Sequence, residues 1–424
     1  MFKTRTMRGT AMVAAAAALA VAVAACGSDG KGNDDATGKA TQAKAALTKS
    51  EIRLGLLAAT TGATSSADVP AVGVANAWAD WVNVNGGING HPVTIVVKDT
   101  KGDIATGTAA AKAFLDDPSI LSITSASSNT EPAIATTLKG KDIAVVGAYG
   151  YQPTIWGAQE NVFPLTAPAV PNILAQFASA KANGAKNWAV ASCVETAACK
   201  QASVFYGPAS KLFDVKVVGS YDVAVSAPSY TAECLKMINT KTDFLQLSFP
   251  PAAAARLIDD CDSQGYKGLY GASGGAVTKA LLDVDGVRLS GGVQGFPWWS
   301  TAKPVTDYRQ AVETYSKGAD PQTAASTSTW AALQTIRAAL AHVGDKPARA
   351  DVFTGLYGLK NFDLGGLLAQ PVTFTKGKIP AGIDCLWLYK YENGKFTTTP
   401  LAGTKSGNSV TSGDLQSTCL KLQA

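Results

Sequence analysis

The strongest constraint on the fold of this chain is a repeated alternation of short apolar, β-rich runs with longer amphipathic stretches. In the first part of the chain the β-rich runs span residues 52–57, 93–97, 120–124 and 143–146. Strands separated by stretches long enough for a helix are typical of βαβ units, in which the strands of one sheet run parallel. The sequence therefore predicts an α/β fold.

The stretch after the first run predicts a helix that packs on this sheet. Val72, Ala75, Ala79 and Val82 recur at spacings of three and four residues, so they share one face of a helix. The glycine pair at residues 86–87 is expected to end that helix.

The alternation restarts after residue 165 and predicts a second α/β lobe. Its expected elements are a helix at 171–182 and strands at 188–191, 216–221, 244–247 and 269–271. A helix at 329–343 and strands at 371–374 and 386–391 come after both sheets are complete. This last part of the chain is expected to close both lobes by crossing between them.

The N-terminal residues 1–25 are expected to be a processed export signal. Basic residues begin the segment, and its apolar stretch, residues 11–25, is shorter than the roughly 20 residues that cross a bilayer. Small residues directly before Cys26 resemble the bacterial lipoprotein cleavage site, at which the cysteine is acylated. The alternative is a plain secretory signal with an incidental cysteine. Residues 26–49 carry few large apolar side chains and are expected to be a flexible tether.

The cysteines favour disulfide bonds over metal or redox chemistry. Of the seven cysteines, one is the predicted lipid anchor, and the other six are an even number in an exported chain. Proximity in sequence predicts the pairs Cys193–Cys199, Cys234–Cys261 and Cys385–Cys419. Free buried thiols are the alternative. The sparse charge, with a net value of +5 and no basic cluster in the body, argues against nucleic acid binding.

Three motifs suggest a known family. A first strand IRLGLL at 52–57 is followed by a hydroxyl-rich loop that includes Thr61; NGGINGHPV at 85–93 leads into the second strand; and SSNTEPA at 127–133 follows the third. Together they resemble the type I periplasmic solute-binding proteins, in the branch of the leucine/isoleucine/valine receptors of ABC importers. The second motif is the most specific of the three.

The resemblance implies two Rossmann-like lobes with parallel sheets, joined by a three-crossover hinge. Lobe 1 would comprise residues 50–166 and 297–368, and lobe 2 would comprise residues 167–296 and 369–424. In open parallel sheets, ligands bind beyond the carboxyl ends of the strands, so the loops after the strands are the candidate site.

The loop after the third strand is the first candidate for ligand binding. Ser127 and Asn129 offer hydrogen-bond donors at a helix N-terminus, where an anion is favoured. A plain helix cap is the alternative, with Thr130 as the N-cap residue and Pro132 in the first turn.

The resemblance adds further contact residues from both lobes. In lobe 1 it implies Thr61 and the loop of Ala148, Tyr149 and Gly150. In lobe 2 it implies Glu195, Phe249 and Ser273, and an aromatic run that includes Trp298 is a candidate pocket wall or, alternatively, part of the packing of the hinge.

The sequence departs from the amino-acid receptors at one of these positions. Those receptors carry an acid after the strand that ends here at Gly271, where it neutralises the ligand ammonium, and this chain has Ser273. An unpaired ammonium in a closed cleft is costly, so the departure selects against zwitterions unless Glu195 supplies the counter-charge.

The GASGG motif at 271–275 is the candidate for an enzymatic function. The motif fits a nucleophile elbow, and Asp307, Asp320 and His342 follow in the order of that hydrolase class. His342 falls on a predicted helix rather than a loop, and the only other histidine is His91, so no catalytic residues are expected. The sequence also indicates no metal site and no nucleotide cofactor.

The expected protein is therefore a monomeric, membrane-tethered receptor on the outer face of the cytoplasmic membrane. It would hold a small polar ligand, namely an amino acid, an amide or a small carboxylate, between its lobes and present it to the permease subunits of an ABC importer. A tethered sensor for a signalling receptor is the alternative, and a serine hydrolase is the remote one.

Overall fold

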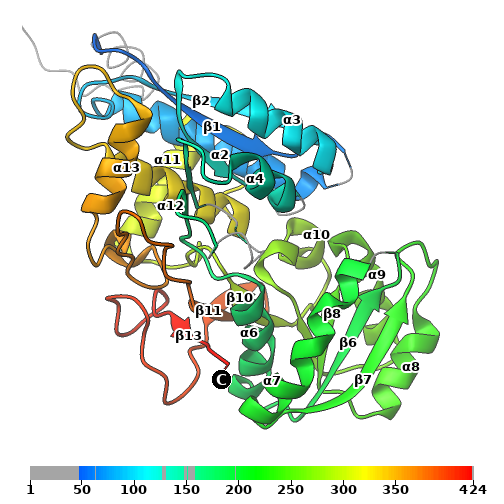
Figure 1. Ribbon diagram of the computed structural model, residues 1–424. Helices are drawn as coiled ribbons and strands as arrows, with labels where there is room; N and C mark the ends of the chain where they lie inside the picture. Colours follow the sequence, from blue (N-terminus) through cyan, green and yellow to red (C-terminus); the bar gives the residue numbers. More distant parts are fainter. Residues whose placement is uncertain are drawn as a thin grey trace, which may run out of the picture. The chain divides into compact units, whose positions relative to one another are not determined.

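A computed structural model describes residues 47–62, 64–126, 130–147, 150, 158–195 and 197–422, which fall within one compact unit, Ala36–Ala424 (Figure 1). Two β-sheets organise this unit. The predicted α/β fold with two lobes is confirmed, and each lobe is built on one of the sheets.

The first sheet has the strand order β2-β1-β3-β4-β5, and all its strands are parallel. Its strands are β1 (Ile52–Ala58), β2 (Val93–Asp99), β3 (Ile120–Ser125), β4 (Ala144–Val146) and β5 (Val162–Phe163). The first four match the β-rich runs to within a residue or two. Since β1 and β3 are buried almost throughout, they read as continuous apolar runs rather than as alternating ones.

Helices α2 (Ser65–Val84), α3 (Ile104–Leu115) and α4 (Glu131–Leu138) connect these strands. On α2, the predicted face is confirmed, with Ala75, Ala79 and Val82 buried and Val72 half-buried. The turn after α2 requires glycine, because Gly87 has a φ of 69° and a Cβ there would lie 2.2 Å from the carbonyl oxygen of His91.

The second sheet has the order β12-β11-β10-β9-β8-β6-β7. Strands β6 (Asn187–Cys193), β7 (Lys216–Val223), β8 (Phe244–Ser248), β9 (Leu269–Gly271) and β10 (Leu289–Val293) run parallel. Strands β11 (Cys385–Glu392) and β12 (Lys395–Thr398) add an antiparallel edge, and β13 (Thr418–Cys419) pairs with β11. The parallel part supplies the carboxyl ends that face the site.

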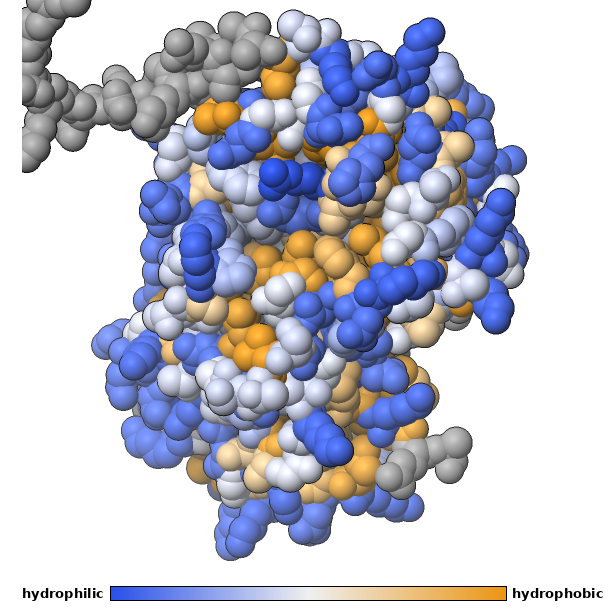
Figure 2. All heavy atoms as spheres, turned by 90° about the vertical axis from the view of Figure 1, so that its left-hand side faces the viewer, coloured by the Kyte–Doolittle hydropathy of each residue, from blue (hydrophilic) through white to orange (hydrophobic). Residues whose placement is uncertain are grey.

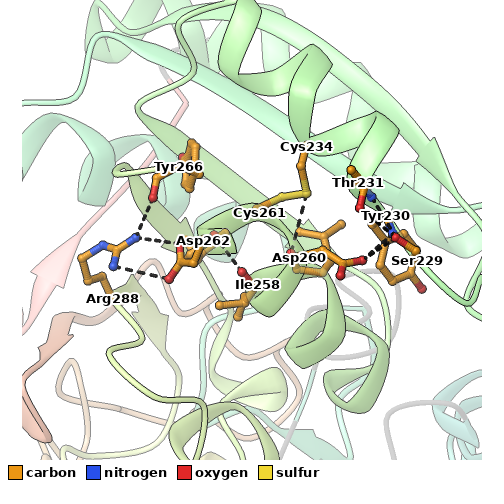
Figure 3. The surroundings of a disulfide bond; sticks show 12 residues. Ser229, Tyr230, Thr231, Cys234, Ile258, Asp260, Cys261, Asp262, Tyr266 and Arg288 are labelled. Atoms are coloured by element: carbon orange, nitrogen blue, oxygen red, sulfur yellow. Dashed lines mark hydrogen bonds and ion pairs between the residues drawn. A yellow bond between two sulfur atoms is a disulfide. The ribbon is translucent and has the colours of Figure 1, made fainter. Parts of the chain in front are cut away.

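The helices of the second lobe are α6 (Ala169–Ala182), η2 (Ala197–Phe205), α7 (Tyr206–Phe213), α8 (Thr231–Asn239), α9 (Pro251–Ser263), η3 (Gly274–Ala276) and α10 (Lys279–Leu282). Helix α6 packs on β10 and β11. Figure 3 shows the disulfide between Cys234 of α8 and Cys261 of α9, whose Cα atoms are 4.9 Å apart. This bond and Cys385–Cys419 are pairs that the sequence suggested. Cys193 is also disulfide-bonded, and the side chain of Cys199 lies outside the described part of the chain.

The chain returns to the first lobe after β10. Helices α11 (Lys303–Tyr315) and α12 (Ala324–Ala339) pack on α2, and α13 (Arg349–Gly358) packs on α12 and β3. A short turn, η4 (Leu364–Gly366), precedes β11. The chain therefore passes from the second lobe to the first and back, as the predicted crossings require.

Two late elements were predicted wrongly. Residues 371–374 form no strand; only Val372 pairs, in an isolated bridge with Phe362, because Pro371 has no N–H to donate to a ladder. Helix α12 begins at Ala324 and ends at Ala339 rather than spanning 329–343. Its start lies earlier because the Thr323 side chain accepts a hydrogen bond from the backbone N–H of Ser326 and caps the helix.

The left-hand face of Figure 1 carries α13 and part of the C-terminal segment, residues 399–422. Figure 2 shows that hydrophilic side chains cover most of this face and that apolar side chains gather across its middle. Within the part of the chain that the structure describes, no helix is both long and apolar enough to cross a membrane.

Candidate ligand-binding site

A cavity of about 450 Å³ lies where the carboxyl ends of the two sheets meet, and we call it the central pocket. Its volume falls in the range of small-molecule sites, roughly 300–1,000 Å³. The first lobe contributes the start of α2, Ala126 after β3 and the start of α12. The second lobe contributes part of α6, the end of β8 with Phe249, and residues 273–278 after β9. The pocket thus forms where parallel sheets place their ligands.

Helix N-termini meet at this pocket. Ser66 near the start of α2, Pro251 at the start of α9 and Ala324 at the start of α12 all line it. The first N–H groups of a helix lack partners within that helix and carry the positive end of its dipole. These helix starts therefore favour acceptor groups of a bound molecule.

Asp68 is the one charged side chain among the described residues that line the pocket. It lies in the first turn of α2 and is 6% exposed. Its Oδ2 accepts a hydrogen bond from the backbone N–H of Ala59 at 2.8 Å. This carboxylate therefore holds the loop after β1 to the start of α2.

Amide side chains form another wall of the pocket. Asn172 and Gln176 lie one turn apart on α6, and Gln246 lies on β8. All three are more than nine-tenths buried. Trp188 and Tyr206 line the pocket as well, with ring centroids 4.9 Å apart.

Two of the predicted contact residues line the pocket. Phe249 follows β8 and is 7% exposed, and Ser273 follows β9. Both occupy the loop positions at which the family resemblance placed them. Their contact with a ligand remains a prediction. Ser127, Asn129, Ala148 and Tyr149 lie outside the described residues.

Two other predicted contact residues, Thr61 and Gly150, have hydrogen-bond partners elsewhere in the protein. The Thr61 hydroxyl donates to Asp99 Oδ2 at 2.6 Å, and the Gly150 carbonyl accepts from Gln294 Nε2 at 3.0 Å.

Neither Glu195 nor Trp298 is among the described lining residues. Glu195 is exposed, and its Oε1 accepts from the Val225 backbone N–H at 2.6 Å. Trp298 is 2% exposed and packs edge-on against Trp299 and Phe396, in keeping with the alternative in which it packs the hinge.

The amide residues of the pocket wall are not among the contacts that the sequence predicts. Asn172 and Gln176 lie on a helix and Gln246 lies on a strand, whereas the predicted contacts lie in loops after strands. A signal was available, because each is a polar residue inside an otherwise apolar run that must be buried. Polar residues in such runs need a partner, and that partner can be a ligand.

The hydrolase triad is not assembled in the described residues. Ser273 lines the pocket, but His342 is exposed beyond the end of α12 and does not line it. Asp307 Oδ2 forms an ion pair with Lys303 Nζ at 2.6 Å. Among the described residues, no hydrogen bond joins Ser273 to His342. Nor does any group of three or more His, Cys, Asp or Glu among the residues described here lie close enough to hold a metal ion.

Two α/β lobes with a pocket lined from both of them form an arrangement that can hold a small solute. The model of the periplasmic binding protein family matches residues 51–395. The chain therefore belongs to the periplasmic binding protein family, as its motifs suggested. A search of curated proteins returned no match.

Solved structures share this fold at low sequence identity. A substrate-binding periplasmic protein from Ralstonia solanacearum has a TM-score of 0.68 at 18% identity, covering 82% of this chain and 100% of its own. An ABC transporter substrate-binding protein from Desulfitobacterium hafniense in complex with Leu has a TM-score of 0.64 at 17% identity, covering 82% and 99%. A fatty acid ABC transporter substrate-binding protein from Thermomonospora curvata has a TM-score of 0.63 at 16% identity, covering 83% and 92%.

Proposed function

We propose that this protein captures a small polar solute in the central pocket and presents it to the permease subunits of an ABC importer. The observation that carries the proposal is the position of the pocket, which is lined from both lobes at the carboxyl ends of both sheets. A ligand that contacts both lobes favours the arrangement in which they close on it. The named function of the two transporter proteins above supports delivery to an importer.

The ligand class is the broad one that the sequence suggested: an amino acid, an amide or a small carboxylate. The structural relatives differ among themselves, since one holds Leu and another is named for fatty acids. We propose that the protein binds its ligand without chemical conversion. The positions of His342 and Asp307 support this reading, because neither is available to activate Ser273.

We propose that the lobes divide as residues 50–166 with 297–368, and 167–296 with 369–424. Support comes from α6, which begins at Ala169 and packs on the second sheet, and from α11 to α13, which pack on the first lobe. A monomer is the proposed state. The proposed contact residues Ser127, Asn129, Ala148 and Tyr149 would complete the pocket from the first lobe.

We propose that the protein is a lipoprotein held at the outer face of the cytoplasmic membrane by Cys26. Supporting this is the N-terminal pattern alone, a basic start, a short apolar stretch and small residues before the cysteine. Cells fed an alkynyl palmitate analogue should label the protein. Labelling should be lost in Cys26→Ser, and equal labelling of that variant would refute the anchor.

The test of solute capture is a thermal-shift screen of the purified protein over amino acids, amides, small carboxylates and sugars. A ligand present at 100 times its Kd stabilises the folded state by about 2.7 kcal/mol, which raises the Tm by several degrees. A hit should then show saturable binding by calorimetry, and cells lacking the protein should lose its uptake. Uptake that continues unchanged in those cells would contradict the importer role.

A further inference from the structure

The C-terminal segment, residues 399–422, is fixed to the second lobe. The disulfide Cys385–Cys419 joins it to the start of β11, and β13 pairs with β11 there (Figure 1). Trp387 Nε1, also on β11, donates a hydrogen bond to the Leu415 carbonyl at 2.9 Å. Because β11 belongs to the second sheet, the segment moves with the second lobe.

The same segment is bonded to the turn η4. Asn408 Nδ2 donates to the Gly366 carbonyl at 2.9 Å, and the backbone N–H of Ser409 donates to Asp363 Oδ2 at 2.9 Å. The other carboxylate oxygen of Asp363 accepts from the N–H of Gly365 at 3.1 Å, so this side chain ties the turn to the segment. In the proposed division of the lobes, η4 belongs to the first lobe and Asn408 to the second. Both bonds to the segment therefore cross the boundary between the lobes.

Close packing accompanies these bonds. Gly366 is buried with a φ of 92°, and a Cβ there would lie 2.6 Å from Cγ2 of Val410. The missing side chain thus lets the segment lie directly on the turn. Leu364 has a φ of 55°, a backbone conformation that leucine adopts only at a cost, so the surroundings of η4 must hold the turn in this shape.

On its other side, η4 rests on the first lobe. The turn contacts α12, and Leu364 and Leu367 line a small cavity together with Trp81 of α2 and Trp330 of α12. The centroids of the two tryptophan rings lie 5.4 Å apart. The turn is therefore placed between helices of the first lobe and a segment that is anchored in the second.

Rotation of one lobe away from the other would pull η4 and the C-terminal segment apart, because each is held by a different lobe. Asn408 is 7% exposed, and breaking its bond to Gly366 would leave buried polar groups without partners. The arrangement in which both lobes line the central pocket is thus favoured before any ligand binds. Since apparent affinity rises with the fraction of the protein in the binding-competent state, this bias strengthens ligand binding.

We propose that the C-terminal segment is an interlobe strap that limits the opening of the central pocket in the ligand-free protein. The family match ends at residue 395, so the strap lies in a part of the chain that the family model does not cover. The inference rests on solute capture in the central pocket, which is the function proposed above, and it adds the residues that set the opening equilibrium.

The distance between the lobes tests the strap. Lys112 on α3 and Lys216 at the start of β7 are exposed and lie on different lobes. Spin labels on Lys112→Cys and Lys216→Cys, in the full chain with Cys26→Ser, report this distance by pulsed electron paramagnetic resonance without any ligand. We expect Asn408→Ala to shift the distance distribution toward longer distances by several ångströms, because a bond that opposes opening is lost.

Asn161→Ala is the matched control. Asn161 Nδ2 also donates to two backbone carbonyls, those of Leu138 at 2.7 Å and Ile143 at 3.1 Å, but all three residues lie in the first lobe. Asn161 is 5% exposed, so its replacement should lower stability without moving the labels. No shift in Asn408→Ala, or an equal shift in both variants, would overturn the inference.

The two disulfides give a second comparison. Cys385→Ser combined with Cys419→Ser frees the strap from β11 and should also lengthen the distance between the lobes. Cys234→Ser combined with Cys261→Ser removes a bond between α8 and α9, inside the second lobe, that closes a loop of similar length. The second pair should leave the distance unchanged. An equal shift in both pairs would overturn the inference, since a general loss of stability would then explain it.

The distance measurement needs no ligand, so its result is separate from that of the solute screen. Unchanged distances together with a confirmed solute would overturn the strap alone. Lengthened distances in the strap variants, together with a screen that finds no solute, would overturn solute capture alone.

Discussion

The side-chain nitrogen of Asn408 donates a hydrogen bond to the carbonyl oxygen of Gly366 at 2.9 Å. This bond joins the C-terminal segment, residues 399–422, to the stretch of chain that crosses from α13 toward β11. The same nitrogen donates to the Leu415 carbonyl at 2.9 Å, and Ser417 Oγ donates to the Ala369 carbonyl at 2.6 Å. The C-terminal segment lies beyond the family match, which ends at residue 395. Its hydrogen bonds to Gly366 and Ala369 hold the crossing stretch in place.

Asn408→Ala should destabilise the protein by about 1–3 kcal/mol, because it removes the donor to the Gly366 carbonyl and one of the two donors to the Leu415 carbonyl, the other being Trp387 Nε1. Asn408 is 7% exposed, so little water reaches those oxygens. Urea unfolding followed by circular dichroism measures the loss. Asn239→Ala is the control, since Asn239 is exposed at the end of α8. A loss no larger than that of the control would contradict the fastening role of Asn408.

Removal of either disulfide should also lower the free energy of unfolding. Cys234–Cys261 and Cys385–Cys419 close loops with sequence separations of 27 and 34 residues. Loop-closure entropy gives roughly 3.5–4 kcal/mol for each, so the two contributions should be nearly equal. Paired Cys→Ser variants, Cys234 with Cys261 and Cys385 with Cys419, should each lose about this amount in urea unfolding under oxidising conditions. Losses that differ by more than about 2 kcal/mol would show that local packing, rather than chain entropy, governs one of them.

The fold was predictable because its signals are local. Strands β1, β3 and β8 are buried apolar runs, and the helical face around Ala75 recurs at helical spacing, so each could be recognised within a short window of sequence. The error at residues 371–374 has a local cause too, because apolar and β-branched residues there mimic a strand although Pro371 cannot join a ladder.

The site was less predictable because it depends on pairing across the fold. The loop positions of Phe249 and Ser273 follow from the rule that ligands bind beyond strand ends. The pocket positions of the amide residues Gln176 and Gln246 do not follow from this rule, since the two residues come together only when α6 packs beside the second sheet. Local sequence also cannot show that the Thr61 hydroxyl and the Glu195 carboxylate have backbone or side-chain partners within their own lobes.

Lysine should not replace Arg349 without a loss of stability. Its Nη2 donates to the carbonyl oxygens of Phe114, Leu115 and Asp117 at 2.8–3.0 Å, and its Nε donates to that of Ile120 at 2.9 Å. The planar guanidinium thus holds the end of α3 and the start of β3 to α13, which a lysine ammonium cannot do in the same geometry. Arg349→Lys and Arg349→Ala should both cost about 2–3 kcal/mol in urea unfolding.

The ion pair of Arg349 offers the matched control. Arg349 Nη1 lies 3.4 Å from Asp142 Oδ1, and the Asp142 side chain is 85% exposed. Exposed pairs contribute little, so Asp142→Asn should change stability by less than about 0.5 kcal/mol. If Asp142→Asn were as damaging as Arg349→Lys, the charge rather than the bonds to carbonyls would be the important feature.

Thr61→Val should raise the pKa of Asp99 toward its ordinary value. The Thr61 hydroxyl is the largest cause that holds the pKa of this carboxyl well below its usual range, and the backbone N–H groups of Lys101 and Thr60 lower it further. A carboxyl with a lowered pKa in the folded state stabilises the protein above its unfolded-state pKa, about 3.9, and loses that contribution as the pH falls through the folded-state value. The wild-type protein should therefore resist acid to a lower pH than Thr61→Val. Carboxyl ¹³C NMR titration of Asp99 and acid unfolding measure the two effects, and Thr61→Ser, which keeps the hydroxyl, should behave as the wild type does. An Asp99 pKa that is the same in Thr61→Val and Thr61→Ser would contradict the assigned role of the hydroxyl.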